Sequence, residues 1–335
     1  MRKSLAAALL AGIVLAATGC ARRDVHRTLR GTAHNPEGWP KIIAVYQPWF
    51  GDPKHIDVGY SSHDTVVIKK QIEQAKSLGI FAFAVDWYGP RLPFLDKAYA
   101  LMQKAAAENN FQVAIMYDET EEDTGHATDD AILAFEKAYH AYIGPGAPGR
   151  EAYMTYNGRP VIFIFPKRGR TDWKIVRNYV DSWEVPPLLI YKDEKSEYAD
   201  RFDGYYAWVH PDKNWAPDGG DWGENYLANF YARMQREHPG KLVVGGAWPG
   251  FDDRKAAWSL NRIMDSRCGR TFEETLRMFR RFHSDSNPLP FLMIATWNDY
   301  EEGTAIERGL AKPEFERSLA KCDSKPGSRS AAGGN

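Results

Sequence analysis

The sequence predicts a single-domain (β/α)8 TIM barrel of the α/β class. Three observations support this fold: eight short apolar runs, amphipathic helical patterns between several of them, and no glycine-rich phosphate motif directly after any expected strand. Short runs that are apolar throughout are typical of strands buried on both faces of a parallel sheet. Because no G-x-G-x-x-G follows an expected strand and no P-loop occurs, a barrel is favoured over a dinucleotide-binding sheet.

The expected strands are rich in β-branched and aromatic residues. They cover residues 42–46, 80–85, 112–116, 161–165, 188–191, 204–209, 242–246 and 291–296. The expected helices carry apolar residues on one face and charged residues on the other, with a period of 3.6 residues. They cover residues 65–78, 94–108, 131–142, 224–237 and 272–282. Gly79 and Gly240 stand where two of these helices should end.

The first residues of the chain predict export and lipidation. Arg2 and Lys3 precede an apolar run over residues 5–17, which is typical of a signal peptide and too short for a membrane-spanning helix. Cys20 directly follows small residues and resembles the cysteine of a bacterial lipobox, so we expect removal of residues 1–19 and a lipid on Cys20. The alternative is an ordinary signal peptide with an incidental cysteine. Lipidation would anchor the protein to the cell envelope, at the periplasmic or outer-membrane face.

Residues 20–38 are expected to form a flexible tether, residues 39–322 the barrel, and residues 323–335 a disordered tail. Loss of two basic residues with the signal peptide changes the formal net charge from −1 to −3. We therefore expect no nucleic-acid partner, which would need a clustered basic face, and the lipid as the membrane contact. Cys268 and Cys322 either form a disulfide or stay unpaired. The sequence does not decide whether these two cysteines pair. It does not indicate the oligomeric state either.

Aromatic and acidic residues gather just past the ends of the expected strands. In (β/α)8 barrels, these ends carry the active site. Tryptophan and tyrosine rings present apolar faces that stack on sugar rings, and carboxylates bind sugar hydroxyls, so the pattern predicts a poly- or oligosaccharide substrate. The expected substrate-binding residues are Tyr46, Trp49, Asp86, Trp87, Tyr88, Tyr117, Asp118, Trp208, His210, Trp248, Trp297 and Asn298. Because the histidines are scattered and no G-x-S-x-G elbow occurs, we expect no metal site, no cofactor and no serine hydrolase.

Two carboxylates, Asp299 and Glu302, follow the last expected strand. Glycosidic cleavage uses one carboxyl group to protonate the leaving oxygen and another as base or nucleophile, and two carboxyls fill both roles when their surroundings separate their pKa values. Spacing alone equally allows Asn298, Asp299 and the glutamates to cap a following helix. Glu301 is expected to be solvated, and Glu307 to cap or pair with that helix.

The run over residues 296–307 resembles the last-strand motif of glycoside hydrolase family 99, the endo-α-mannosidases. That motif reads (Phe/Trp)-Asn-Glu-Trp-x-Glu-Gly-Thr-x-Ile-Glu, and the α-1,3-glucanases of family 71 have a Trp-Asn-Asp-Tyr-x-Glu version. Residues 46–51, 86–90 and 249–253 are also similar to this group. The resemblance implies that Glu302 is the general acid/base and Asp299 its partner carboxylate. In the mannosidases the partner is a glutamate that deprotonates the 2-hydroxyl of the sugar, and the shorter aspartate favours the glucanase version.

The sequence thus predicts an exported lipoprotein that cleaves α-linked, mannan- or glucan-type glycans without a metal. A non-catalytic surface glycan-binding lipoprotein and a polysaccharide-assembly relative of the same fold are the alternatives. The sugar, its linkage, endo or exo action, and retention or inversion at the anomeric carbon stay open.

Overall fold

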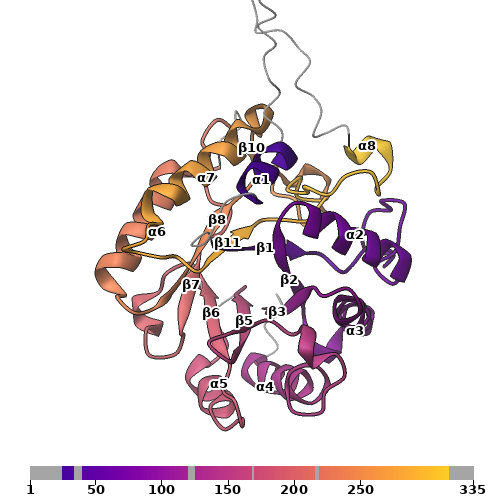
Figure 1. Cartoon of the computed structure of the whole chain (residues 1–335), viewed down its shortest axis with the longest axis vertical. Coiled ribbons are helices and arrows are strands. Elements are labelled where there is room, and N and C mark those ends of the chain that lie inside the picture. The colour runs from indigo at the N-terminus through magenta and orange to yellow at the C-terminus, as the bar shows by residue number, and fades with distance from the viewer. Residues whose placement is uncertain (1–24, 34–39, 120–124, 168–169, 216–218, 317–335) are drawn as a thin grey trace, which may run out of the picture.

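The computed structural model describes residues 25–33, 40–119, 125–167, 170–215 and 219–316. Within these ranges, eight parallel strands close into a barrel in chain order (Figure 1), which confirms the predicted fold class. The last strand pairs with the first, and no edge stays open. The barrel strands are β1 (Lys41–Tyr46), β2 (Ile80–Trp87), β3 (Gln112–Asp118), β5 (Arg159–Phe165), β6 (Leu188–Lys192), β7 (Gly204–Tyr206), β8 (Leu242–Ala247) and β11 (Phe291–Ile294).

Helices surround the barrel, as Figure 1 shows. They are α2 (Thr65–Ser77), α3 (Pro93–Glu108), α4 (Ala127–Ala138) with a π-helical turn over Tyr139–Ile143, α5 (Trp173–Val180), α6 (Glu224–Glu237) and α7 (Arg270–Phe282). The expected helices match these within a few residues, except α5, which was not expected because eight residues give little periodicity. Its N-cap is Asp172, whose carboxylate accepts the N–H groups of Lys174 and Ile175.

Shorter elements fill the connections. They are the 3-10 turns Gly89–Arg91, Arg150–Ala152, Ser196–Tyr198, Asp253–Lys255 and Arg267–Gly269, the short strands β4 (Thr155–Tyr156), β9 (Phe251–Asp252) and β10 (Ile263–Met264), and α8 (Pro313–Glu316). Strands β9 and β10 pair antiparallel and form a hairpin-like excursion after β8. This excursion matters for the site, because the segment between its strands carries residues that reach the mouth of the barrel.

Side chains of each barrel strand point alternately inward and outward, as strand geometry requires. The inner cluster contains Val45, Ala84, Met116, Phe163 and their equivalents on the other strands. The outer cluster, which packs between strands and helices, contains their sequence neighbours. This alternation decides which residues at a strand end face the interior of the barrel.

The segment expected to be a flexible tether contains a helix, α1 (Val25–Ala33). Val25, His26 and Leu29 are buried against the barrel, and the His26 Nε2 atom lies 2.6 Å from the carbonyl oxygen of Ile306. In Figure 1, α1 lies between α7 and α2. The prediction of a tether was therefore wrong for this segment, because a single apolar face of two turns was enough to dock it.

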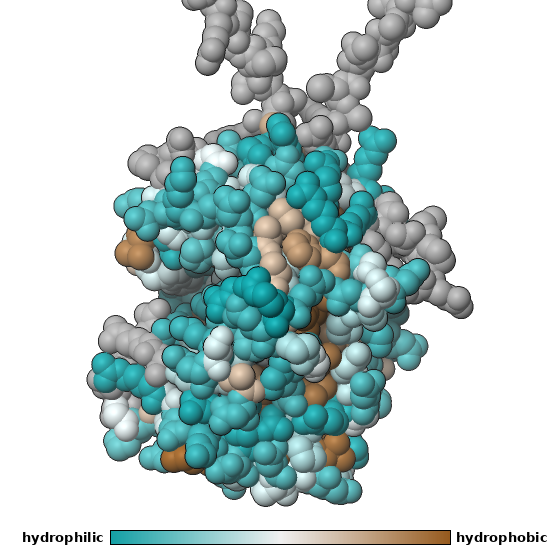
Figure 2. Space-filling model, turned by 90° about the vertical axis from the view of Figure 1, so that its left-hand side faces the viewer, coloured by the Kyte–Doolittle hydropathy of each residue, from teal (hydrophilic) through white to brown (hydrophobic). Residues whose placement is uncertain are grey.

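The face shown in Figure 2 is largely hydrophilic, and its hydrophobic residues form a narrow band and a few isolated positions. Among the described residues, no helix is long and apolar enough to cross a membrane. The predicted signal peptide, the lipidation residue Cys20, the predicted tail and Cys322 all lie outside the described residues. Lipidation and pairing of Cys268 with Cys322 therefore stay predictions.

Candidate active site

A cavity of about 550 Å³ opens at the carboxyl ends of the barrel strands. Its floor includes Val45 and Met116 of the inner cluster, so it is the upper end of the barrel interior. Its lining includes the carboxylates of Asp86, Asp118, Asp299 and Glu302 and the ammonium group of Lys167. Aromatic walls come from Trp49, Tyr88, Phe165, Trp208 and Trp258. The cavity therefore combines acidic groups with apolar ring surfaces, as the strand-end pattern predicted.

The loop after β11 brings Asp299 and Glu302 into this cavity. Asp299 Oδ1 accepts the backbone N–H groups of Glu301, at 3.0 Å, and Glu302, at 2.8 Å. The backbone N–H of Asp299 donates to Thr296 Oγ1 at 2.9 Å. No α-helix begins in this loop, so the alternative that these residues cap the N-terminus of a following helix was wrong. Asp299 caps a tight turn instead, and this turn is what presents both carboxylates to one space.

The two carboxylates have different surroundings. The Asp299 side chain is 1% exposed, and its Oδ2 atom lies 3.5 Å from Gln47 Nε2. The Glu302 side chain is 19% exposed, and its Oε1 atom accepts the indole N–H of Trp258 at 2.9 Å. Arg262 Nη2 is 3.9 Å from the same oxygen. Glu302 is thus fixed by donors on one oxygen and is the more accessible of the pair.

The pKa values of both carboxyl groups are raised. Burial raises the pKa of Asp299 well above its usual range, and the neighbouring charge of Glu302 raises it further. Burial also raises the pKa of Glu302, although the Trp258 hydrogen bond and the Arg262 charge partly oppose this. Because two like charges so close together cannot both form cheaply, the pair retains a proton at a higher pH than isolated carboxyls would.

A second acidic pair lies on the neighbouring strands β2 and β3. Asp118 Oδ2 accepts the Tyr88 hydroxyl at 3.0 Å and lies 3.2 Å from Lys167 Nζ. Burial raises the pKa of Asp118 to about 6 against the lowering effect of Lys167. Asp86 Oδ1 is buried with no hydrogen-bond partner among the described residues. Burial, followed by the charge of Asp118, raises the pKa of Asp86 well above its usual range.

Replacing Asp86 with asparagine should stabilise the fold above about pH 5, because the wild-type carboxyl resists ionisation in the folded state. The pKa of this carboxyl is higher in the folded protein than in the unfolded chain. Below the pKa of the unfolded chain the carboxyl is protonated in both states and does not affect stability. As the pH rises from that value through the pKa of the folded protein, the folded state loses stability. The stability gained by Asp86→Asn should therefore be near zero at pH 3.5 and grow toward pH 8. Each kcal/mol gained should raise Tm by about 2–4 °C. Thermal melts at both pH values measure it, with exposed Asp285→Asn as the control. An Asp86→Asn protein less stable than wild type at pH 8 would contradict this reading.

Several predicted substrate-binding residues do not line the cavity. Tyr46, Trp87 and Tyr117 belong to the outer cluster, because alternation along their strands turns them toward the helices. Trp248 and Trp297 are also fully buried, and their indole N–H groups donate to Trp222 O and Glu307 Oε1. These five are corrected from substrate ligands to core residues.

Two further predicted ligands take other places. His210 is exposed and does not line the cavity, and its Nδ1 atom lies 2.6 Å from Pro211 O. Asn298 is buried and exchanges two hydrogen bonds with the backbone of Gln47, at 2.7 and 2.9 Å. Asn298 therefore joins the β11 loop to the end of β1 and supports the site from behind. The predicted residues that the structure does bring into the cavity are Trp49, Asp86, Tyr88, Asp118, Trp208, Asp299 and Glu302.

Sequence reasoning missed several side chains in and around the site. Lys167 follows β5 and stands two residues after Phe165, which faces the cavity. Because residues two apart in a strand point to the same side, this spacing indicates that Lys167 faces the cavity too. Trp258 and Arg262 lie in the excursion after β8, where no periodic pattern points at the barrel. His55, in the loop after β1, lines the cavity beside Trp49.

Both remaining glutamates of the strand-eight run differ from expectation. Glu301 is 1% exposed rather than solvated, and its carboxylate binds His55 Nδ1 at 2.8 Å and the Ile56 N–H at 3.2 Å. Glu307 is fully buried and meets no following helix. It accepts four side-chain donors instead, from Tyr60, Gln71, Trp297 and Tyr300.

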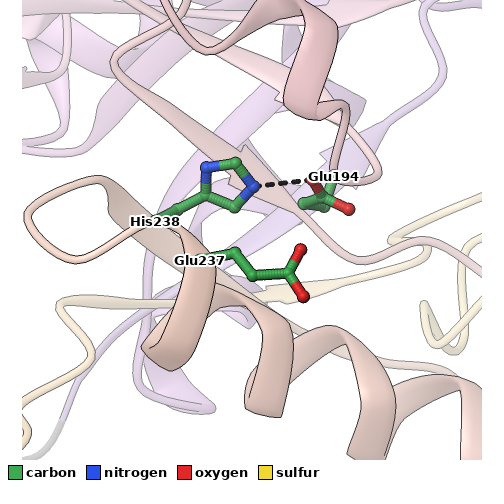
Figure 3. A group of neighbouring side chains, drawn as sticks. All are labelled: Glu194, Glu237 and His238. Carbon is green, nitrogen blue, oxygen red and sulfur yellow. Dashed lines mark hydrogen bonds and ion pairs between the residues drawn. The ribbon is translucent and has the colours of Figure 1, made fainter.

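A separate group of possible metal ligands lies outside the cavity, formed by Glu194, Glu237 and His238 (Figure 3). His238 Nε2 lies 2.6 Å from Glu194 Oε1, the contact drawn in Figure 3. The Arg233 guanidinium contacts both glutamates, at 2.5 Å from Glu194 and 3.2 Å from Glu237. The arginine and histidine thus satisfy these carboxylates, and their closeness is explained as an ion-pair network without a cation.

Comparisons with known proteins agree with this fold. No family model matches the chain. The glycoprotein endo-alpha-1,2-mannosidase-like protein of Danio rerio is 23% identical over 303 residues, covering 85% of this chain and 63% of that protein. The chain thus spans less than two thirds of the length of this curated relative.

Two solved structures share the architecture. The family 99 endo-alpha-mannosidase of Bacteroides thetaiotaomicron, in complex with bis-tris-propane, has 19% identity and a TM-score of 0.61, covering 82% of this chain and 88% of that chain. A glycoside hydrolase-like protein has 14% identity and a TM-score of 0.58, covering 83% and 91%. In its fold, the chain is a barrel protein like the endo-α-mannosidases of glycoside hydrolase family 99.

Proposed function

We propose that this protein is a glycoside hydrolase that cleaves α-linked, mannan-type glycans, with Glu302 as the general acid/base and Asp299 as its partner carboxylate. One observation carries the proposal: the turn after β11 presents both groups to one cavity, where burial raises the pKa of each. The preference for α-mannan over α-glucan draws on the mannosidases to which the chain is similar.

Glu302 is suited to the acid role by its position and accessibility. Trp258 fixes its Oε1 atom, and burial raises the pKa of the carboxyl, which favours the protonated form that an acid needs. In the proposed step, Glu302 gives this proton to the glycosidic oxygen as the bond to the anomeric carbon breaks. A water molecule supplies the hydroxyl that takes the place of the departing sugar on that carbon, and the remaining proton of this water returns to the carboxyl pair.

Asp299 is suited to the base or nucleophile role. Two backbone N–H groups donate to Oδ1 and hold the carboxylate in place, and Oδ2 lies 3.5 Å from Gln47 Nε2. In the proposed step Asp299 acts as the carboxylate, and the two backbone N–H groups on its Oδ1 atom favour its charged form. Trp49, Trp208 and Trp258 supply ring faces on which sugars stack.

The test is hydrolysis by the purified soluble domain. We expect release of reducing ends from α-mannan, and no release from β-mannan, which has the same sugar in the opposite anomeric linkage. α-Glucan is the comparison that decides between the two glycan types. No release from any α-linked glycan would rule out the hydrolase and favour the glycan-binding alternative.

Export and lipid anchoring at Cys20 belong to the proposal and are supported by the N-terminal sequence pattern. Wild type should fractionate with membranes, and Cys20→Ala should not. Equal fractionation of the two would count against lipidation.

A further inference from the structure

Glu301 is a buried carboxylate that the proposed reaction does not use. It stands between Tyr300 and Glu302 in the turn, and its charge contributes to the raised pKa of Asp299. A third buried acid beside two others is costly unless it is paired and hydrogen-bonded. Its two oxygens bind the loop after β1, at His55 Nδ1 and at the backbone N–H of Ile56. The effect of Glu301 is therefore to fix His55.

His55 is held in one orientation by two independent contacts. Its ring stacks on the Trp49 indole, with centroids 4.6 Å apart and planes 2° from parallel. Because a carboxylate oxygen only accepts, Nδ1 carries a hydrogen toward Glu301, and Nε2 is the polar atom of the ring left for another partner. His55 and Trp49 both line the cavity. The Trp49 Nε1 atom is buried with no hydrogen-bond partner among the described residues.

Trp258 joins this wall to the proposed acid. Its ring meets Trp49 edge-on at 5.8 Å and His55 at 6.0 Å, while its Nε1–H binds Glu302. A general acid stands on the side of the leaving group, because it protonates the leaving oxygen. A wall of rings that adjoins Glu302 therefore faces the sugar that departs.

We propose that His55, Trp49 and Trp258 form a subsite for the sugar on the leaving-group side of the scissile bond, with His55 as a substrate-binding residue and Glu301 as its positioning residue. This inference rests on the proposed hydrolase function. The rings supply the stacking surface, and His55 Nε2 supplies a polar partner for a sugar hydroxyl.

The test compares two substrates that are identical except on the leaving side: an α-mannooligosaccharide, and an aryl α-glycoside whose leaving group is not a sugar. His55→Phe keeps a ring against Trp49 and removes both nitrogens. We expect it to raise KM for the oligosaccharide about tenfold, the size of one lost hydrogen bond, and to raise KM for the aryl glycoside clearly less, because that leaving group has no hydroxyl for His55 Nε2. Glu301→Gln should shift the same KM in the same direction, by less, because the amide keeps one accepting oxygen.

His140→Phe is the matched control, since His140 is exposed on the Tyr139–Ile143 turn and does not line the cavity. Equal losses of His55→Phe on both substrates, or no loss on either, would overturn the subsite while leaving the hydrolase standing. A wild type inactive on both substrates would instead overturn the proposed function, and the subsite with it. Melting temperatures of the variants show that each is folded.

Discussion

Glu302→Gln should lower kcat/KM for an α-linked oligosaccharide by about 10²–10⁴-fold, the usual contribution of a general acid. Glutamine fills the same space and still accepts the Trp258 N–H through its amide oxygen, but it has no proton to give. The same variant should lose far less on an aryl α-glycoside with a dinitrophenyl leaving group, because that group departs without protonation. Steady-state kinetics on the two substrates measures the difference.

Asp299→Asn provides the comparison within the pair. Its remaining oxygen still accepts the two backbone N–H groups of the turn, so the loop should keep its form. Because a base or nucleophile is needed whatever the leaving group, this variant should lose activity on both substrates to a similar degree. Exposed Glu314→Gln is the control for a lost carboxylate. If Glu302→Gln lowered kcat/KM equally for both substrates, Glu302 would not be the general acid.

Glu307→Ala should cost roughly 4 kcal/mol or more of unfolding free energy, one of the largest effects for a single residue in this fold. The fully buried carboxylate accepts Tyr60 at 2.7 Å, Gln71 at 2.6 Å, Tyr300 at 2.8 Å and Trp297 at 3.1 Å. Each buried donor left without an acceptor costs about 1–3 kcal/mol, and the removed side chain leaves a cavity. Chemical denaturation measures the loss.

Glu307→Gln separates the hydrogen bonds from the packing. The amide has nearly the same volume, but its NH2 group faces donors where the carboxylate accepted them, so it too should destabilise the protein. Exposed Glu73→Gln on α2 should stay within about 0.5 kcal/mol of wild type. A Glu307→Gln protein as stable as wild type would show that the four donors find other partners.

The fold was predictable because its signals are local and repeated. Each barrel strand is a short apolar run, and α2, α3, α6 and α7 carry clear helical periods. The segments that were missed lack such a signal. Helix α5 has eight residues, and α1 stands in a polar stretch in which Val25, His26 and Leu29 are the buried side chains among residues 25–30.

The site was predictable in part, for a reason that strand geometry explains. Asp86 and Trp87 are neighbours at the end of β2, yet one lines the cavity and the other packs under the helices. Alternation along the strand decides this, and residue type does not. Every second residue at the end of β5 points into the barrel, and this alternation would also have indicated Lys167. Trp258, in contrast, lies in the irregular segment after β8, whose position only the tertiary structure shows.

Glu301 and Glu307 show a further limit of sequence reasoning. Acidic residues are ordinarily exposed, so Glu301 was expected to be solvated, and Glu307 was expected to cap or pair with a following helix. Each is buried because partners distant in sequence satisfy it: His55 and Ile56 for Glu301, and Tyr60 and Gln71 for Glu307. Such partners become visible only when the chain has folded.

One measurement tests the central claim most directly: mass-spectrometric product analysis after incubating the protein with an α-mannooligosaccharide of defined length. We predict shorter oligosaccharides with the wild-type protein, and intact substrate with Glu302→Gln over the same time. If the wild-type protein leaves the substrate intact while calorimetry shows that it binds, the cavity is a glycan-binding site and the assignment of Glu302 and Asp299 as a catalytic pair is wrong.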